Sequence, residues 1–185
     1  ALFIWHQLLE KERTTNGKDT QRASRLGPAF SDDEISKYLE QNEAVYTTCE
    51  TDEQLCNEVA SLIASEKVIG WFQGRMEFGP RALGSRSIIG DARSQKMQSV
   101  MNLKIKFRES FRPFAPIVLK EHVHEYFQMR ENEDSPYMLL VAPVREEIRN
   151  DLPDDYDKTF GIDKLNHSRS SIPAITHVDF SARVQ

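Results

Sequence analysis

Arginine and lysine residues gather between Gly70 and Leu119, where they are interleaved with glycines and prolines. This stretch holds nine basic and three acidic residues, a net charge of +6 in a chain of net charge −5, so the remainder carries −11. Like charges that are held close together repel one another, so the fold needs a reason to keep them. A polyanionic ligand is the commonest such reason, and phosphate groups are the leading candidates.

The first basic segment is GRMEFGPRALGSRS, residues 74–87. Its glycines, Gly74 and Gly79, have the spacing of a phosphate-binding loop, but that loop requires Lys and then Ser or Thr after the second glycine. Pro80 and Arg81 stand there instead, and proline has no amide hydrogen to donate. The segment therefore predicts a rigid turn that directs Arg81, with Gly79 taking a backbone angle that other residues avoid.

The second basic segment is NLKIKFRESFRPFAP, residues 102–116. Arginine binds phosphate through two parallel hydrogen bonds, whereas lysine acts as a mobile point charge. The cavity expected from both segments is formed by Arg81, Arg86, Lys104, Lys106, Arg108 and Arg112. We expect Glu77 and Glu109 to orient arginines rather than to act as general bases. On charge alone, a solvated basic face with scattered ion pairs explains the pattern equally well.

The flanking sequence predicts a mixture of helices and strands. Ser31 and Glu34 form the pattern of a capping box at the start of a short helix. Apolar periodicity predicts further helices over 1–12, 51–66, 94–107 and 121–127. Runs of β-branched and aromatic residues predict strands over 45–49, 68–72, 137–144 and 172–178, with a strand-like stretch over 181–185. Residues 145–171 are charged and poorly patterned, which is typical of a long excursion. The expected fold class is α/β, with α+β as the alternative.

Length and composition predict one substantial core in a soluble protein, with 185 residues, 39% hydrophobic and 29% charged. The sequence has neither an apolar run of membrane-spanning length nor a signal-peptide pattern, so no membrane partner is expected and the cytoplasm is the default location. The two cysteines, Cys49 and Cys56, make no disulfide framework. The chain starts at Ala1 and ends at Gln185 in an open strand-like stretch, so we expect a piece of a longer protein.

Three blocks carry a family resemblance: GWFQGRMEFGPRALGSRSI, NLKIKFRESFRPFAP and ITHVDFSARVQ. Their order resembles the C-terminal region of the O-carbamoyltransferases that decorate nodulation factors, cephamycins and aminoglycosides. The resemblance implies a YrdC-like twisted mixed sheet with flanking helices and a basic cavity. It also implies three parts: residues 1–12 as the last helix of a truncated actin-like transferase domain, 13–30 as a linker, and 31–185 as a YrdC-like domain truncated at its C-terminus.

The resemblance further implies that this domain uses carbamoyl phosphate and ATP, with Mg²⁺, to form carbamoyl-adenylate. The missing N-terminal domain, which holds its own metal outside this chain, then transfers the carbamoyl group to a hydroxyl. By motif match, the catalytic residues are Arg81, Lys106 and Arg112. The matched binding residues are Arg75, Arg86, Arg108, Ser181 and Arg183. The sequence departs from the family at Ser85, where asparagine is usual, and at Phe180, where glycine is usual.

Other interpretations stay open at this point. A concave basic surface also suits RNA, although the −11 charge elsewhere would repel a long phosphate backbone. The chain could instead only dock and position a catalytic domain, and a homodimer is a further alternative. His122 and His124 point in different directions on a helix, so we expect no shared metal. For His177 and Asp179, we expect an edge-strand hydrogen bond rather than a ligand contact.

Overall fold

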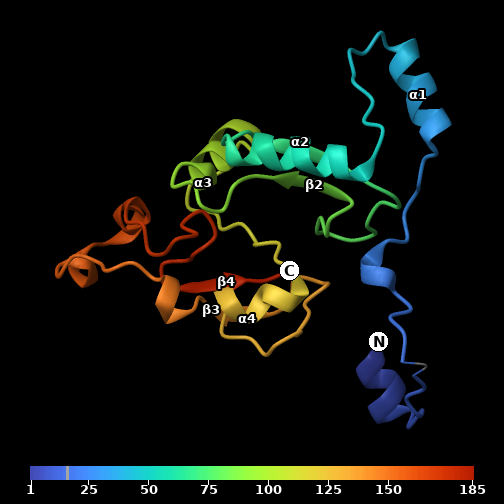
Figure 1. Ribbon diagram of the computed structural model, residues 1–185. Coiled ribbons are helices and arrows are strands. Elements are labelled where there is room, and N and C mark those ends of the chain that lie inside the picture. The colour runs from blue at the N-terminus through green and yellow to red at the C-terminus, as the bar shows by residue number, and fades with distance from the viewer. Residues whose placement is uncertain (16) are drawn as a thin grey trace.

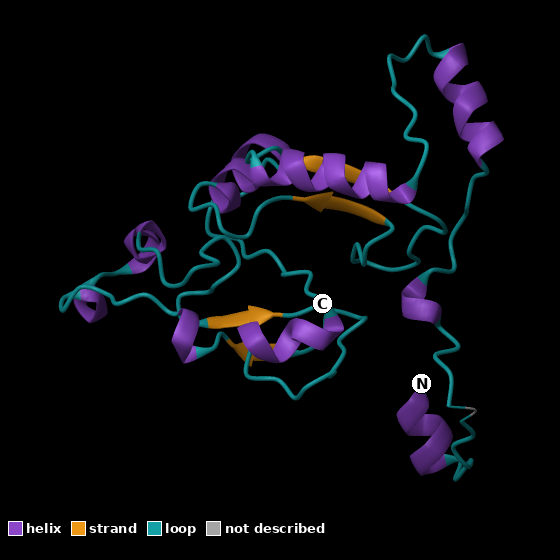
Figure 2. Ribbon diagram, in the orientation of Figure 1, coloured by secondary structure: helices purple, strands orange, loops and turns teal. Residues whose placement is uncertain are grey.

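The computed structural model describes residues 1–15 and 17–185 (Figure 1). The α-helices are α1 (Asp32–Gln41), α2 (Asp52–Ala64), α3 (Met97–Val100) and α4 (Val123–Tyr126). The strands are β1 (Ile69–Phe72), β2 (Arg86–Ile89), β3 (Val141–Pro143) and β4 (Ser181–Arg183). Two π-helical turns cover Ile4–Leu8 and Met101–Ile105. Short 3-10 helices cover Arg22–Ser24, Lys120–His122, Glu146–Ile148, Tyr156–Lys158 and Gly161–Asn166. Figure 2 shows how much of the chain is loop.

The first sheet pairs β1 with β2 in antiparallel register, from Ile69 opposite Ile89 to Phe72 opposite Arg86. Figure 1 shows α2 lying along this sheet, and α2 contacts β1. Thr51 caps α2, because its hydroxyl accepts a hydrogen bond from the Gln54 amide at 3.1 Å. This sheet ends where the first basic segment begins, so it fixes both ends of the 73–85 loop.

The second sheet pairs β3 with β4, with Ala142 opposite Ala182. Ala142 and Ala182 face the core, where they join Val123, Phe127 and Val144. Alternate residues of a strand point to opposite faces, so Ser181 and Arg183 lie on the face of β4 away from that core. The sheet therefore supports a hydrophobic core on one side and polar chemistry on the other.

The capping box before α1 is confirmed. The Ser31 hydroxyl accepts from the Glu34 amide at 3.3 Å, and the Glu34 carboxylate accepts from the Ser31 amide at 2.8 Å. In Figure 1, α1 lies apart from both sheets. Near the N-terminus, the π-helical turn leaves its apolar side chains in solvent, with Ile4 53% and Leu8 71% exposed.

The expected mixture of helices and strands is confirmed. Within the described residues, the strands form two antiparallel pairs, and the YrdC-like arrangement stays a prediction. The strand predictions for 45–49 and 172–178 were wrong. Residues 45–49 are irregular and exposed, so a β-branched run there has no sheet edge to complete. Residues 172–178 form a buried turn, and the strand begins at Ser181 instead. None of the described helices has the length and apolar character needed to cross a bilayer.

Phe180 lies in the left-handed region, with φ of 61°, in the tight turn that starts β4. The turn is closed by hydrogen bonds from the Phe180 amide to the His177 carbonyl at 3.0 Å and from the His177 amide to the Ser181 carbonyl at 2.9 Å. A residue with a Cβ is strained at this backbone angle. This strain gives a physical reason to favour glycine at this position.

We expect Phe180→Gly to be more stable than Phe180→Ala by about 1 kcal/mol, because only glycine adopts this φ without strain. Both variants remove the ring that stacks 5.0 Å from the Arg149 guanidinium, so the comparison isolates the backbone. Urea denaturation of the two variants measures the difference. Equal stabilities would contradict the left-handed conformation at this turn.

Candidate functional site

Arg81 borders a cavity of about 340 Å³. The cavity is lined by Gln21, Ser24, Gly79, Pro80, Arg81, Leu83, Tyr137 and Leu139. Gly79 has φ of 154°, an angle that residues with a Cβ rarely adopt, which confirms the predicted special backbone at this turn. The Arg81 side chain is exposed and stands at the end of a loop that is anchored from inside.

The anchor is the buried carboxylate of Glu77, which is only 7% exposed. Its Oε1 accepts hydrogen bonds from the amides of Leu83 at 2.7 Å, Ser85 at 2.7 Å and Arg86 at 3.3 Å. Glu77 thus orients the arginine-bearing loop through backbone amides, that of Arg86 included, and not through an arginine side chain. Burial raises the pKa of Glu77, but the amide hydrogen bonds outweigh burial and hold the pKa below its ordinary value.

This lowered pKa predicts a pH-dependent stability. A carboxylate with a lowered pKa in the folded state contributes stability above its ordinary pKa of 4.5 and loses that contribution as the pH falls further. We expect Glu77→Gln to cost about 1–3 kcal/mol at pH 7, because the charged acceptor is lost. The difference between wild type and variant should shrink between pH 5 and pH 3 in urea denaturation. A constant difference would contradict the ionised anchor.

Two arginines of the first segment use their guanidinium groups to hold the loop. Arg86 donates from Nη1 to the carbonyls of Gln73 at 3.0 Å and Ser85 at 2.9 Å, and from Nη2 to Gly74 at 3.1 Å. The Arg86 guanidinium also stacks on Phe72, 3.4 Å from the ring centre. Arg75 donates to the Leu26 carbonyl at 3.1 Å, which joins the linker to the loop. Both predicted binding residues therefore have a structural contact in this structure.

The second basic segment is organised around Asn102, which is fully buried. Its Nδ2 donates to the carbonyls of Ser110 at 3.0 Å and Arg112 at 2.8 Å, and its Oδ1 accepts from Arg108 Nε at 2.6 Å. The Arg112 side chain pairs with Glu109 at 3.2 Å, which confirms the expected orienting role of that carboxylate. Lys106 is exposed. Sequence reasoning missed Asn102, although a polar residue among inward-facing positions was an available signal.

The C-terminal turn supplies the most unusual group of the site. Within the part of the chain that the structure describes, Arg183 Nε is buried without a hydrogen-bond partner. Burial and then the nearby Arg81 guanidinium lower the pKa of Arg183. The charge of Arg81 thus acts on Arg183, although 101 positions separate them in the sequence. A buried, unpartnered guanidinium nitrogen under the influence of a second cation is suited to an anion.

Ser181 lies beside Arg183 and is part of a short hydrogen-bonded chain. Its hydroxyl donates to Asp179 Oδ1 at 2.7 Å and lies 3.1 Å from His177 Nδ1. The hydrogen bond from Ser181 lowers the pKa of Asp179, while burial lowers the pKa of His177. His177 makes the expected hydrogen bond across the turn, and it also borders a cavity of about 440 Å³ together with Phe111 and Pro113.

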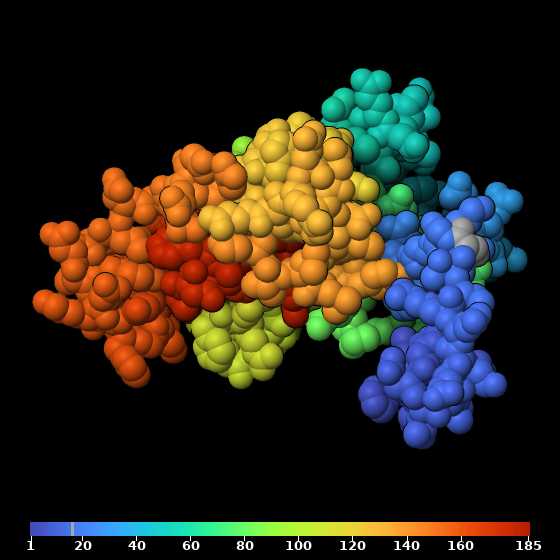
Figure 3. Space-filling view, turned by 90° about the horizontal axis from the view of Figure 1, so that it is seen from below, coloured from blue at the N-terminus to red at the C-terminus, as the bar shows by residue number. Residues whose placement is uncertain are grey.

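This shared cavity places the second basic segment beside the C-terminal turn. In Figure 3, red C-terminal atoms reach the surface between the yellow-green chain near residue 105 and the green chain near residue 80. Among the described residues, those lining the Arg81 cavity do not include Lys106 or Arg112. The convergence of Arg81, Lys106 and Arg112 on one ligand therefore stays a prediction. Across the same described residues, no three His, Cys, Asp or Glu side chains group to hold a metal ion.

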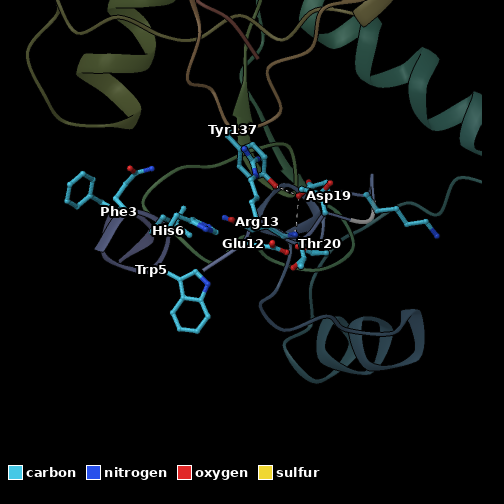
Figure 4. Close-up of a pocket in the computed structure, with 14 residues that line it drawn as sticks. Phe3, Trp5, His6, Glu12, Arg13, Asp19, Thr20 and Tyr137 are labelled. Atoms are coloured by element: carbon cyan, nitrogen blue, oxygen red, sulfur yellow. Dashed lines mark hydrogen bonds between the residues drawn. The ribbon is translucent and has the colours of Figure 1, made fainter. Parts of the chain in front are cut away.

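A cavity of about 1210 Å³ is lined by residues of the N-terminal segment, among them Trp5 and Arg13, and by Tyr137 (Figure 4), and it shares Gln21 and Tyr137 with the Arg81 cavity. The Tyr137 hydroxyl donates to Asp19 at 2.5 Å, which attaches the 13–30 segment to the rest of the chain. The residues that line this 1210 Å³ cavity are largely exposed side chains of the N-terminal segment. We therefore place the candidate functional site at Arg81 and Arg183, where buried and charged groups converge.

The fold is a mixed arrangement of helices and small antiparallel sheets, and its arginine-rich loops carry the candidate site. Residues 60–185 match the family described as carbamoyltransferase C-terminus, and the chain belongs to that family.

Curated relatives agree with this assignment. An uncharacterized protein, sll1178, of Synechocystis sp. is 57% identical over all of this chain and 30% of its own length. Nodulation protein NolNO of Sinorhizobium fredii is 43% identical over 70% of this chain and 17% of its own length. The 3'-hydroxymethylcephem-O-carbamoyltransferase of Streptomyces clavuligerus is 36% identical over 69% of this chain and 20% of its own length. The chain thus spans less than a third of the length of each of these relatives.

Proposed function

We propose that this chain is the part of an O-carbamoyltransferase that binds carbamoyl phosphate and ATP and forms carbamoyl-adenylate. The carbamoyl group would then pass to a hydroxyl of a small biosynthetic acceptor. The observation that carries the proposal is the Nε of Arg183, which is buried and has no hydrogen-bond partner among the described residues, with the charge of Arg81 acting on it. Membership of the carbamoyltransferase C-terminus family supports the choice of carbamoyl phosphate as the anion.

The arginine pair suits a phosphate better than a structural role. Two guanidinium groups repel, and burying one of them costs further solvation energy. A doubly charged phosphate offsets both terms and accepts bidentate hydrogen bonds from each fork. Arg112 and Lys106 would complete the neutralisation of the substrates, and Arg108 would hold the loop that carries Arg112. Arg75 and Arg86 would act mainly by shaping the Arg81 loop.

The proposed reaction balances as carbamoyl phosphate, ATP and water giving carbamoyl-adenylate, pyrophosphate and phosphate. Mg²⁺ enters as part of the ATP substrate. Charge develops at the α-phosphate while pyrophosphate leaves, so arginines that are fixed in place before the reaction lower the barrier. Ser181 would shape the anion site from β4 without donating to the anion, because its amide and hydroxyl both donate to Asp179.

The transfer of the carbamoyl group to the acceptor hydroxyl is assigned to a separate transferase domain with its own metal. Residues 1–12 would be its last helix, 13–30 the linker and 31–185 the adenylate-forming domain. The 185-residue chain alone should then release pyrophosphate without carbamoylating any alcohol. Carbamoylation of an acceptor alcohol by this chain alone would overturn the division of labour.

Titration calorimetry with carbamoyl phosphate, and separately with ATP and Mg²⁺, tests the proposal. We expect both ligands to bind the wild-type chain. The Arg183→Met substitution should lower the affinity for carbamoyl phosphate at least tenfold. Lys96→Met is the matched control, because it removes one exposed charge from the stretch between Gly70 and Leu119, and it should change the affinity little. Absence of carbamoyl phosphate binding, or equal losses in both variants, would contradict the proposed site.

A further inference from the structure

Two of the buried polar atoms without partners lie in one turn. Among the described residues, these atoms are Ser94 Oγ, His124 Nδ1, His177 Nε2 and Arg183 Nε. A buried donor or acceptor without a partner costs free energy, so a pair at one place calls for an explanation. His177 and Arg183 belong to the same turn and strand, and the Arg183 charge contributes to the lowered pKa of His177.

The hydrogen bonds of the turn fix which nitrogen of His177 carries the proton. Asp179 accepts hydrogen bonds at Oδ1 from both the amide and the hydroxyl of Ser181, at 3.0 and 2.7 Å. The single hydroxyl hydrogen of Ser181 is thereby used, so Ser181 Oγ must accept from His177 Nδ1. In a neutral imidazole, Nε2 is then an acceptor. Arginine Nε carries a hydrogen and can only donate.

The acceptor and the donor belong to one turn and the strand that follows it. Ala182 points into the core, so Ser181 and Arg183 point away from it. The His177 amide donates to the Ser181 carbonyl, two residues before Arg183, and the Arg183 charge acts on the His177 ring. A buried acceptor and a buried donor in one such turn are complementary to a group with one NH₂ and one carbonyl oxygen.

We propose that His177 Nε2 and Arg183 Nε recognise the carbamoyl group itself: its NH₂ donates to His177 and its carbonyl oxygen accepts from Arg183. This inference rests on the proposed function and adds to it the origin of the selectivity for a carbamoyl substrate. His177 also lines the 440 Å³ cavity together with Phe111 and Pro113, so its turn borders open space. Arg81, whose charge acts on Arg183, would hold the phosphate.

Acetyl phosphate is the discriminating probe, because it replaces the NH₂ with a methyl group of similar size. The methyl group cannot donate, so Nε2 would stay unpaired beneath the bound ligand. One unmade hydrogen bond corresponds to about three- to tenfold in affinity. We expect the wild-type chain to prefer carbamoyl phosphate over acetyl phosphate by this factor, measured by calorimetry with inorganic phosphate as a third ligand.

The variants His177→Leu and His177→Gln test the residue. The His177→Leu variant should bind carbamoyl phosphate and acetyl phosphate with equal affinity, because it loses affinity for carbamoyl phosphate. Its affinity for inorganic phosphate should not change. The glutamine amide oxygen can replace Nε2 as an acceptor, so His177→Gln should keep part of the preference. The control is His124→Gln, which alters another histidine with a buried unpartnered nitrogen and should keep the full preference.

Nitrogen NMR of the wild-type imidazole gives a readout that needs no variant. We expect the Nε2 resonance to shift with carbamoyl phosphate and to stay in place with acetyl phosphate. Carbamoyl phosphate, acetyl phosphate and inorganic phosphate could all bind without a preference for carbamoyl phosphate and without a shift of the Nε2 resonance. In that case the proposed carbamoyl contact is wrong, while the anion site stands. If none of the three binds, the proposed function itself fails.

Discussion

Replacing Arg81 with alanine is expected to slow carbamoyl-adenylate formation by about 30- to 1000-fold. This range corresponds to about 2–4 kcal/mol of lost transition-state stabilisation, the scale of one preorganised electrostatic donor. The reason is that the loop carrying Arg81 is held by Glu77 before substrate arrives, and that the Arg81 charge already acts on Arg183. Pyrophosphate release from ATP in the presence of carbamoyl phosphate measures the effect.

Arg81→Lys should recover only part of the rate, because an ammonium group replaces the charge but not the planar fork. The free energy of unfolding should hardly change in either variant, since removing Arg81 relieves repulsion on Arg183. Lys96→Met again serves as the matched control. Normal pyrophosphate release by Arg81→Ala would remove Arg81 from the catalytic assignment.

The largest effect on stability is expected at Arg169, which is only 1% exposed. Its Nε and Nη2 donate to the Thr176 carbonyl at 3.2 and 2.8 Å, and Nε also donates to His177 at 3.1 Å. Its Nη1 donates to the carbonyls of Lys164 at 2.7 Å and His167 at 3.1 Å. Arg169→Met would leave these carbonyls unsatisfied, so we expect a loss of about 3–5 kcal/mol.

Urea denaturation of Arg169→Met measures this loss, with Arg145→Met as the control. Arg145 makes an exposed ion pair with Glu147 at 2.8 Å, and such pairs contribute at most about 1 kcal/mol. The free energy of unfolding of Arg169→Lys should lie between those of Arg169→Met and the wild type, because one ammonium group cannot reach all four carbonyls. Similar stabilities for Arg169→Met and Arg145→Met would contradict the structural role of the buried guanidinium.

The sequence predicted the features that depend on local patterns. The capping box at Ser31, the helix after Thr51 and the strand ending at Phe72 follow from side-chain type and spacing alone. The excess of positive charge around Arg81 also indicated an anion site without any knowledge of the fold. Local chemistry of this kind is readable because the residues involved are close in sequence.

Features that depend on how the chain turns in the folded state were not readable. Arg169 lies in a charged segment that predicts an excursion, yet its guanidinium is buried because carbonyls before and after it in the chain, at Lys164 and Thr176 among others, accept its hydrogen bonds. The apolar run at 172–178 predicts a strand, but the core takes these side chains from a turn instead. The effect of the Arg81 charge on Arg183 depends on two loops far apart in the sequence, so no spacing rule could reveal it.

The internal position of the Glu77 carboxylate has a consequence for kinetics. The loop that carries Arg81 is held by three amide hydrogen bonds from beneath, independently of any ligand. Its conformational entropy is therefore lost when the chain folds and not when a ligand arrives. Association should then occur in one step on a preformed surface, with a rate constant set by diffusion and charge steering and reduced by added salt.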